Sequence, residues 1–283
     1  MTLILDGKKA RDFYKTELIK RVNALKAKGL VPCLAIVQIG DNAESTIYIQ
    51  QKKKFAEAIG AQVEHIKLPA NTAQTALVAK IESLNSNKKV HGIIIQFPIP
   101  ASLDKLALMN LIDPKKDVDG LGDESQRLLD EGIPRFIPAT AKGVMALLDF
   151  YKISVDGKLA AVFGRSRLVG HPMAALLKIR GASVAVIHSQ TPNPKEISSG
   201  ADVVITAMGK AKYVTAEFIH TGAVVVDVGI NSVEGKLVGD VDYNDVSVKA
   251  SAISPVPGGV GPMTVLSLFD NLILSVEKYG VNR

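Results

Sequence analysis

Apolar residues along this chain fall into two kinds of segment. Short continuous apolar runs, typical of buried strands, alternate with longer segments in which apolar residues recur every three or four positions, as on one face of a helix. The expected strands lie within residues 32–40, 61–68, 89–97, 160–164, 182–188, 201–209 and 223–231. The repeated order of strand and helix predicts an α/β protein with parallel sheets.

The pattern is interrupted once, near the middle of the chain. Pro98 and Pro100 end the third expected strand, because proline has no N–H to donate to a sheet. After an irregular stretch, a helical segment from residue 140 leads into stronger alternation. We therefore expect two α/β domains with a cleft between them: residues 1–139, and residues 140–263 as a Rossmann-like doubly wound sheet. A final helix within 264–283 is expected to pack back on the first domain.

Two local features refine this picture. The helical segment 41–60 begins with Asp41 and Glu44, which have the spacing of a capping box. Residues 159–177 read as strand, turn and helix, with Gly164 and Gly170 in the turn. Such a turn suits phosphate, because glycine admits close backbone approach and the free N–H groups of the helix start face an anion. The G-x5-G spacing is not the usual dinucleotide fingerprint, so ordinary architecture remains an alternative.

The next expected strand bears on which nucleotide would bind. It ends at His188 and Ser189, where an NAD site places a carboxylate on the ribose hydroxyl. With Arg165 and Arg167 nearby, the chemistry favours a 2′-phosphate, since guanidinium binds phosphate oxygens bidentately. NADP is thus favoured over NAD, and an exposed turn arginine beside a backbone-bonded serine is the alternative.

Composition narrows the function classes. The single cysteine, Cys33, lies in an apolar run, so we expect no disulfide, and we predict no metal site. No continuous apolar run reaches membrane-spanning length and residues 1–10 lack a signal-peptide core, so a cytoplasmic location is expected. The net charge of +6 suits an anionic small molecule as well as nucleic acid, and the low aromatic content of 5% disfavours the latter.

Candidate chemistry gathers in the first domain. Ser45, Tyr48 and Lys52 are spaced to share one helix face. Gln96 ends a buried strand, where the carboxyl ends of parallel strands face a ligand crevice. Asp117 and Asp119 are loop carboxylates that suit a polar heterocycle. The alternatives are a solvated helix face with a snorkelling lysine and an ordinary Asp-Gly turn.

A turn rich in proline and glycine, residues 254–264, precedes the last helix. The chain resembles the bifunctional methylenetetrahydrofolate dehydrogenase and methenyltetrahydrofolate cyclohydrolase family. The resemblance rests on the PVPGGVGPMT sequence of this turn and on four further motifs: S-x-x-Y-x-x-x-K at 45–52, GIIIQFPIP at 92–100, KDVDG at 116–120 and GRSRLVGHP at 164–172. The resemblance covers nearly the whole chain. It implies NADP-dependent oxidation of 5,10-methylenetetrahydrofolate, hydrolysis of the methenyl product to 10-formyltetrahydrofolate, and a homodimeric enzyme of one-carbon metabolism.

The resemblance also implies roles for single residues. Lys52 would be the general acid/base of hydrolysis, Tyr48 would orient the folate, Gln96 would bond lysine and substrate, and Asp119 would bind the pterin. Further substrate contacts are expected from Ser45, Pro257 and Gly258. The residues expected to hold NADP are Gly164, Arg165, Ser166, Ser189 and Ile230.

The chain departs from the family pattern in two places. LGDESQR at 121–127 and PATA at 138–141 replace the usual residues. We expect these changes to affect folate affinity and cofactor-loop geometry more than reaction type. Three alternatives remain at this point: an enzyme with dehydrogenase activity alone, a shikimate-type NADP dehydrogenase of similar two-domain plan, and, least favoured, a non-enzymatic nucleic-acid binder.

Overall fold

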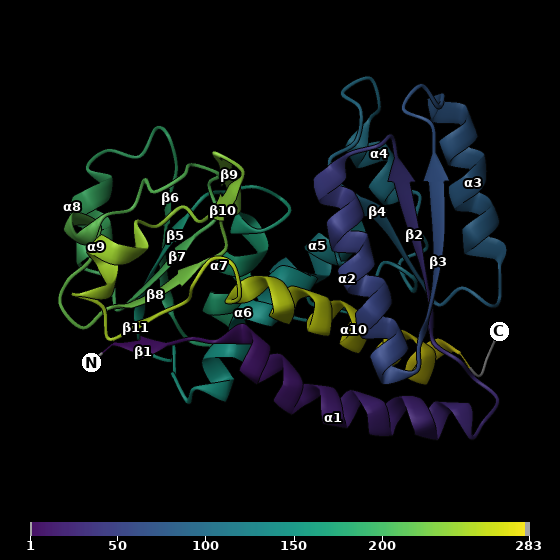
Figure 1. The fold of residues 1–283 in the computed structure, drawn as a ribbon, viewed down its shortest axis with the longest axis horizontal. Helices are drawn as coiled ribbons and strands as arrows, with labels where there is room; N and C mark the ends of the chain where they lie inside the picture. Colours follow the sequence, from purple (N-terminus) through teal and green to yellow (C-terminus); the bar gives the residue numbers. More distant parts are fainter. Residues whose placement is uncertain (1, 281–283) are drawn as a thin grey trace. The chain divides into compact units, whose positions relative to one another are not determined.

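The computed structural model describes residues 2–280, which form two compact units (Figure 1). One unit comprises Tyr14–Ala139 and the chain from Val265 onward, and we call it the lysine unit because it contains Lys52. The other comprises the residues up to Phe13 together with Thr140–Thr264, and we call it the glycine-turn unit because it contains Gly164. The chain therefore crosses between units near residue 140, where the hydrophobic pattern changes.

The lysine unit is built on a three-stranded parallel sheet in the order β3-β2-β4. Every residue of the central strand is buried, which explains its unbroken apolar run. The strands are β2 (Cys33–Ile39), β3 (Gln62–Leu68) and β4 (Gly92–Gln96). The helices of this unit are α2 (Ala43–Ile59), α3 (Gln74–Ser86), α4 (Lys105–Asn110) and α5 (Asp123–Asp130), together with most of α1 (Gly7–Lys26). All three predicted strands are confirmed, and Cys33 is a buried strand residue as expected.

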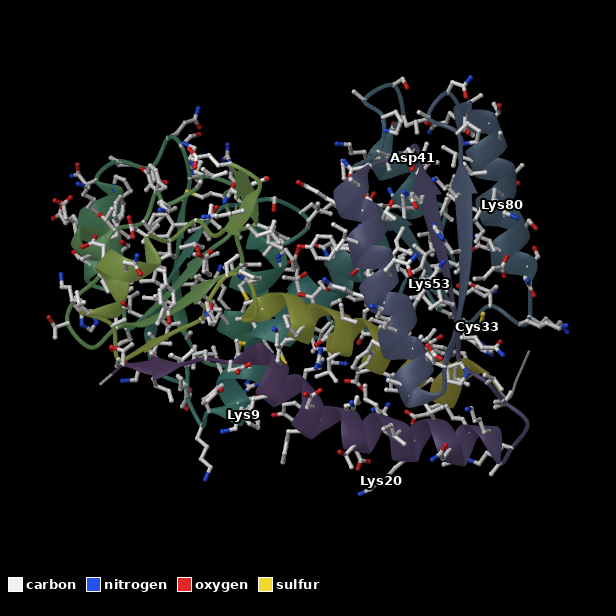
Figure 2. The ribbon with its side chains drawn as sticks, in the orientation of Figure 1. Lys9, Lys20, Cys33, Asp41, Lys53 and Lys80 are labelled. Atoms are coloured by element: carbon white, nitrogen blue, oxygen red, sulfur yellow. The ribbon has the colours of Figure 1, made fainter. Side chains whose placement is uncertain are left out.

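Helix α2 begins differently from the predicted capping box. Its N-cap is Asn42, whose side chain accepts a hydrogen bond from the Ser45 backbone N–H at 2.8 Å. Asp41 lies just outside the helix (Figure 2) and instead pairs with Lys67 on β3 at 2.7 Å. The capping box was therefore wrong: asparagine caps as well as aspartate does, and a neighbouring ammonium competes for Asp41.

Helix α10 (Val260–Tyr279) completes the lysine unit's core from Val265 onward. Asn271 Nδ2 donates to the carbonyl oxygens of Val118 and Ile137 at 2.9 and 2.8 Å, and Ser275 Oγ donates to that of His91 at 2.8 Å. The helix is long and apolar enough on average to cross a membrane, but 67% of its apolar window is buried. It is thus a core helix of this unit.

The glycine-turn unit contains a six-stranded parallel sheet in the order β1-β11-β8-β7-β5-β6. Its strands are β1 (Leu3–Ile4), β5 (Leu159–Phe163), β6 (Ser183–Ile187), β7 (Val203–Thr206), β8 (Val224–Asp227) and β11 (Ala252–Ile253). Its helices are α6 (Ala139–Phe150), α7 (Gly170–Ile179), α8 (Pro194–Ser199) and α9 (Tyr243–Ser247), with a short 3₁₀ helix at Ala216–Phe218. The chain passes from β5 to β6 on one side and returns to β7 on the other side of β5. This reversal is the switch point of a doubly wound sheet, so the predicted fold class is confirmed.

The hydrophobic pattern did not reveal all strands of this unit. The two-residue strands β1 and β11 are too short to show a period. The hairpin of β9 (Asn231–Val233) and β10 (Lys236–Val238) is mostly exposed and turns through Glu234 and Gly235, both with positive φ. Such strands bury too little apolar surface to produce the expected signal.

Candidate active site

Lys52 and Gln96 meet in the lysine unit. Helix α2 carries Lys52, and Gln96 is the last residue of β4. Lys52 Nζ donates a hydrogen bond to Gln96 Oε1 at 2.7 Å, and Gln96 Nε2 donates to the carbonyl oxygen of Phe97 at 2.9 Å. The second bond fixes which end of the amide faces the lysine. The structure therefore brings together two residues that lie 44 positions apart in the sequence.

Burial changes the pKa values of both Lys52 and Asp119. It lowers the pKa of Lys52 to about 8, against the opposing effect of Asp119. Burial likewise raises the pKa of Asp119 to about 6, while the Lys52 charge lowers it. At pH 7 Asp119 is mostly ionised, and about a tenth of Lys52 is the free amine that a base requires.

Tyr48 lies one helical turn before Lys52 and is half-buried. Burial raises the pKa of its phenol, and the charge of Glu44 adds to the increase. The phenol therefore keeps its proton at neutral pH and is a hydrogen-bond donor. Ser45, on the same helix, is buried, and its hydroxyl donates to the Phe97 carbonyl oxygen at 3.0 Å. Ser45 thus anchors the turn that follows Gln96, and its contact with substrate stays a prediction.

The structure separates the two candidate carboxylates of the KDVDG loop. Asp117 is buried, and its oxygens accept hydrogen bonds from the backbone N–H groups of Gly120 at 3.1 Å and Gly122 at 2.9 Å. It also accepts a bond from Ser125 Oγ at 2.6 Å. Asp117 is thereby occupied in holding the start of α5. Asp119 is the carboxylate whose charge acts on Lys52.

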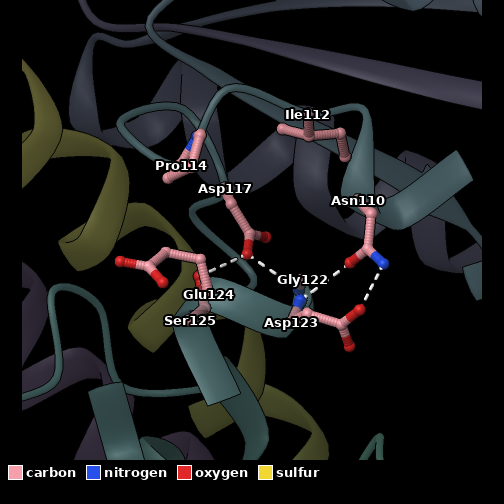
Figure 3. Close-up of a pocket in the computed structure, with 8 residues that line it drawn as sticks. All are labelled: Asn110, Ile112, Pro114, Asp117, Gly122, Asp123, Glu124 and Ser125. Carbon is pink, nitrogen blue, oxygen red and sulfur yellow. Dashed lines mark hydrogen bonds between the residues drawn. The ribbon is translucent and has the colours of Figure 1, made fainter. Parts of the chain in front are cut away.

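Segment 121–127, whose sequence departs from the family pattern, lies around Asp117. It helps to form a pocket of about 220 Å³, lined by Asn110, Ile112, Pro114, Asp117, Gly122, Asp123, Glu124 and Ser125 (Figure 3). None of the four candidate catalytic residues lines this pocket. The replaced residues therefore form a local network around Asp117 and leave the Lys52–Gln96 pair in place.

In the glycine-turn unit, the predicted phosphate turn follows β5. Gly164 has a φ of 112°, and a Cβ there would lie 2.3 Å from the carbonyl oxygen of Ala207. A Cβ on Gly170 would lie 2.2 Å from the Gly164 carbonyl oxygen. Only glycine fits either position. The turn between them leaves Arg165 and Ser166 exposed at the carboxyl end of β5, beside the switch point.

Further candidate cofactor residues follow the neighbouring strands. Ser189 is exposed just beyond β6, and no carboxylate stands between that strand's end and Thr191, whose hydroxyl accepts a bond from the His188 N–H at 2.9 Å. Ile230, beyond β8, is 45% exposed. Glycines that admit close backbone approach, an exposed guanidinium and a ribose site without a carboxylate together fit NADP.

The proline- and glycine-rich turn packs tightly against the start of α1. The Gly258 carbonyl oxygen accepts a bond from the Gly7 N–H at 2.9 Å, and a Cβ on Gly7 would lie 1.7 Å from the Gly259 carbonyl oxygen. Pro257 is exposed. The turn is thus fixed by the backbone, and the contacts of Pro257 and Gly258 with substrate stay predictions.

Two buried aspartates were not singled out by sequence reasoning. Asp227 ends β8, and Asp240 follows β10; both lie within the glycine-turn unit. The sequence did contain a signal for Asp227, which directly follows a continuous apolar run in VVVDVG. A carboxylate in such a place is expected to be buried, and a buried charge needs several hydrogen-bond partners.

Comparisons with known proteins show the family to which this sequence and fold correspond. A family model described as tetrahydrofolate dehydrogenase/cyclohydrolase, catalytic domain, matches residues 5–119, and its NAD(P)-binding counterpart matches residues 138–280. The bifunctional protein FolD of Thermodesulfovibrio yellowstonii is 45% identical over 97% of this chain and 96% of its own.

Two solved structures are similar throughout. The bifunctional FolD methylenetetrahydrofolate dehydrogenase/cyclohydrolase of Campylobacter jejuni has a TM-score of 0.95 and 40% identity, covering 98% of this chain and 99% of that one. The corresponding Trypanosoma brucei enzyme, complexed with NADP cofactor and inhibitor, has a TM-score of 0.95 and 34% identity, covering 100% and 99%.

Proposed function

The chain belongs to the tetrahydrofolate dehydrogenase/cyclohydrolase family, and from this premise we propose how its residues carry two reactions. The enzyme oxidises 5,10-methylenetetrahydrofolate with NADP and hydrolyses the methenyl product to 10-formyltetrahydrofolate. The bifunctional activity expected from the resemblance is thereby confirmed. Membership of this family decides against the shikimate-type and nucleic-acid-binding alternatives.

The hydrolytic step is assigned to Lys52, and the observation that carries this assignment is its hydrogen bond with Gln96 combined with a pKa lowered to about 8. The free amine takes a proton from the water that attacks the methenyl carbon. The resulting ammonium returns a proton to the ring nitrogen as its bond to that carbon breaks, and the second proton of the water is released. A cationic substrate lowers the pKa of Lys52 further, which increases the fraction of free base.

Gln96, Tyr48 and Asp119 support this step in our proposal. Gln96 holds the lysine amine through Oε1 and remains oriented by its bond to the Phe97 carbonyl oxygen. Tyr48 supplies a protonated phenol to orient the folate. Asp119 binds N–H donors of the pterin, because it is mostly ionised at pH 7 and Asp117 is already occupied.

The NADP site is assigned to the carboxyl edge of the glycine-turn sheet. When bound, NADP accepts a hydride from the one-carbon unit of the folate. Gly164 admits the backbone close to the cofactor, Arg165 and Ser166 supply donors for phosphate oxygens, and Ser189 and Ile230 border the ribose and the ring. In this proposal residues 1–139 with the last helix form the folate domain and residues 140–263 the NADP domain, with the chain before Tyr14 packed in the glycine-turn unit.

Remaining substrate contacts and assembly rest on the family resemblance. We assign Ser45, Pro257 and Gly258 to the folate site, and a homodimer in the cytoplasm, without nucleic-acid or membrane partners, to the working enzyme. Sedimentation equilibrium tests the dimer, which requires a mass twice the chain's 30.1 kDa. A mass of one chain would contradict it.

The activity is tested by incubating the protein with 5,10-methylenetetrahydrofolate and either NADP or NAD. Reduced cofactor and methenyl-folate are followed separately by absorbance. We expect reduced NADP to form while methenyl-folate stays low, because the second reaction removes it. Accumulation of methenyl-folate at its rate of formation would contradict the hydrolytic assignment, and an equal rate with NAD would contradict the proposed 2′-phosphate contacts.

A further inference from the structure

Asp227 and Asp240 form a pair of buried carboxylates that the proposed reactions do not use. Asp227 is 3% exposed and Asp240 is fully buried. They are linked directly, because the backbone N–H of Asp240 donates to Asp227 Oδ1 at 3.1 Å. Burying two negative charges is costly unless hydrogen bonds compensate, so their partners indicate what they hold in place.

Asp240 holds the segment that follows β7. Its carboxylate accepts backbone N–H bonds from Met208 at 2.7 Å, Gly209 at 3.1 Å and Lys210 at 2.8 Å. Three successive N–H groups around one carboxylate form a nest. Asp240 also accepts a bond from Asn231 Nδ2 at 3.0 Å, which ties in the segment that follows β8.

Asp227 accepts hydrogen bonds at the carboxyl ends of β7 and β8, where these segments begin. It accepts bonds from Thr206 Oγ1 at 2.9 Å, from the Gly229 N–H at 3.0 Å and from the Val241 N–H at 2.9 Å. Thr206 ends β7 and Asp227 ends β8, so the carboxylate joins the carboxyl ends of two neighbouring strands.

The backbone packs closely around both carboxylates. A Cβ on Gly229 would lie 2.2 Å from Asp240 Cγ, and one on Gly239 would lie 1.8 Å from Asp227 Oδ2. The segments after β8 and β10 therefore pack directly on the two side chains, and the segment after β7 is bonded to Asp240. A change of charge or size at Asp240 must move these segments.

These segments lie at the carboxyl edge of the doubly wound sheet, where open α/β sheets bind their ligands. Ala207, in the first segment, contacts the Gly164 turn, and Ile230 lies in the second. We propose that Asp240 is the positioning residue for NADP, fixing the segments 207–210 and 228–231 in their binding conformation, and that Asp227 positions Asp240. The inference rests on the proposed cofactor site and adds the residues that shape it.

The test is the Asp240→Asn variant of the full chain. In this variant an NH₂ group, which is a donor, replaces one of the two carboxylate oxygens. If it replaces Oδ2, the bonds from the Met208 and Gly209 N–H groups are lost; if it replaces Oδ1, the bonds from the Lys210 N–H and Asn231 Nδ2 are lost. We expect the Kd and KM for NADP to rise about 10- to 100-fold, the range of lost bonds to a charged group. We expect kcat at saturating NADP and KM for the folate to change less than about threefold. Hydrolysis of supplied methenyl-folate, which requires no NADP, should stay within about twofold and shows that the lysine unit is folded. The retained kcat at saturating NADP shows that the glycine-turn unit is folded as well.

The matched control is Asp202→Asn. Asp202 also accepts a backbone bond, from the Leu159 N–H at 2.9 Å, but at the amino end of β5. It should leave the Kd for NADP unchanged. Equal effects of the two variants would show a merely structural role and overturn the proposal.

Two milder variants keep the test decisive if Asp240→Asn does not fold. Asn231→Ala removes one bond to Asp240, and Thr206→Val removes one bond to Asp227 with little change of shape. Each should raise the Kd for NADP about three- to tenfold with hydrolysis unaffected. A Kd within about twofold of the wild type in both would overturn the proposal. Absence of both activities in the wild type would instead contradict the proposed function.

Discussion

Two adjacent lysines on one helix differ in chemistry because they face different surroundings. Lys52 is held by Gln96 and its pKa is lowered by burial, whereas the next residue, Lys53, donates to His65 Nδ1 at 3.1 Å. The sequence placed Lys52, Tyr48 and Ser45 on one face but gave no measure of depth. Residue type alone did not distinguish Asp117 from Asp119, because which of them bonds to backbone depends on how the loop folds; only the family resemblance singled out Asp119.

The pH dependence of hydrolysis follows from Lys52. In the proposed mechanism the free amine is the active form, so activity should rise as pH increases through the pKa of about 8. We expect kcat/KM for hydrolysis, which reports the free enzyme, to increase about tenfold for each pH step of one unit well below that pKa and to level off above it. A rate profile between pH 6 and 9.5 measures this. A flat profile over pH 7 to 9 would contradict the role of Lys52.

Lys52 should also lower stability at neutral pH. Its folded-state pKa of about 8 lies below the ordinary lysine value of 10.5, so the penalty for the buried charge is complete below pH 8 and is relieved as pH rises towards 10.5. The difference between the two pKa values corresponds to a penalty of about 3 kcal/mol. Solvent screening of the half-buried side chain lowers this penalty, and a substitution of Lys52 also loses the bond to Gln96, so the expected net gain from removing the charge is about 1–2 kcal/mol.

Lys52→Met should therefore increase the free energy of unfolding at pH 7, and the gain should shrink at pH 10. Urea denaturation at both pH values measures it, with Lys53→Met as the control of equal size and position. A Lys52→Met protein less stable than the wild type at pH 7 would refute this prediction.

At the scale of elements, turns shape the proposed cofactor site. The apolar pattern located β5 and the glycine turn because a parallel strand is buried on both faces and so leaves a continuous run. It missed β11, the β9–β10 hairpin and the Asn42 cap, since these depend on backbone pairing and side-chain competition. The Asp227–Asp240 pair was likewise beyond reach, because its partners come from segments separated along the chain.

Gly164→Ala tests the turn itself. An added Cβ would meet the Ala207 carbonyl oxygen at 2.3 Å in a backbone conformation that alanine rarely adopts. We expect the KM for NADP to rise at least about tenfold with hydrolysis unchanged, since strain of about 1–3 kcal/mol acts on this turn.

Steady-state kinetics of both activities measure the effect. Gly222→Ala is the control, because Gly222 also has a positive φ in the same unit but has no atom within 4 Å of an added Cβ. Equal KM values for NADP in the two variants would show that the close approach at Gly164 has no bearing on the cofactor.

At the scale of the molecule, the proposed base of hydrolysis and the proposed cofactor site lie in different units. The lysine unit carries Lys52, Gln96 and Asp119, and the glycine-turn unit carries the cofactor turn and the Asp227–Asp240 pair. The sequence indicated this division through the change of pattern near residue 140 and its motifs. It did not indicate that Ser125, within the departure at 121–127, would bond to Asp117, since that contact depends on how the loop folds. Single substitutions should therefore separate the two reactions.

The most direct test of the account measures both activities of Lys52→Gln beside Lys53→Gln. Lys52→Gln should lower the rate of methenyl-folate hydrolysis by at least about 100-fold, the usual contribution of a general acid/base, while NADP reduction stays within about tenfold of the wild type. Lys53→Gln should retain both activities. Loss of both activities to the same extent in Lys52→Gln, or hydrolysis that survives the substitution, would contradict the assignment of the hydrolytic step to Lys52.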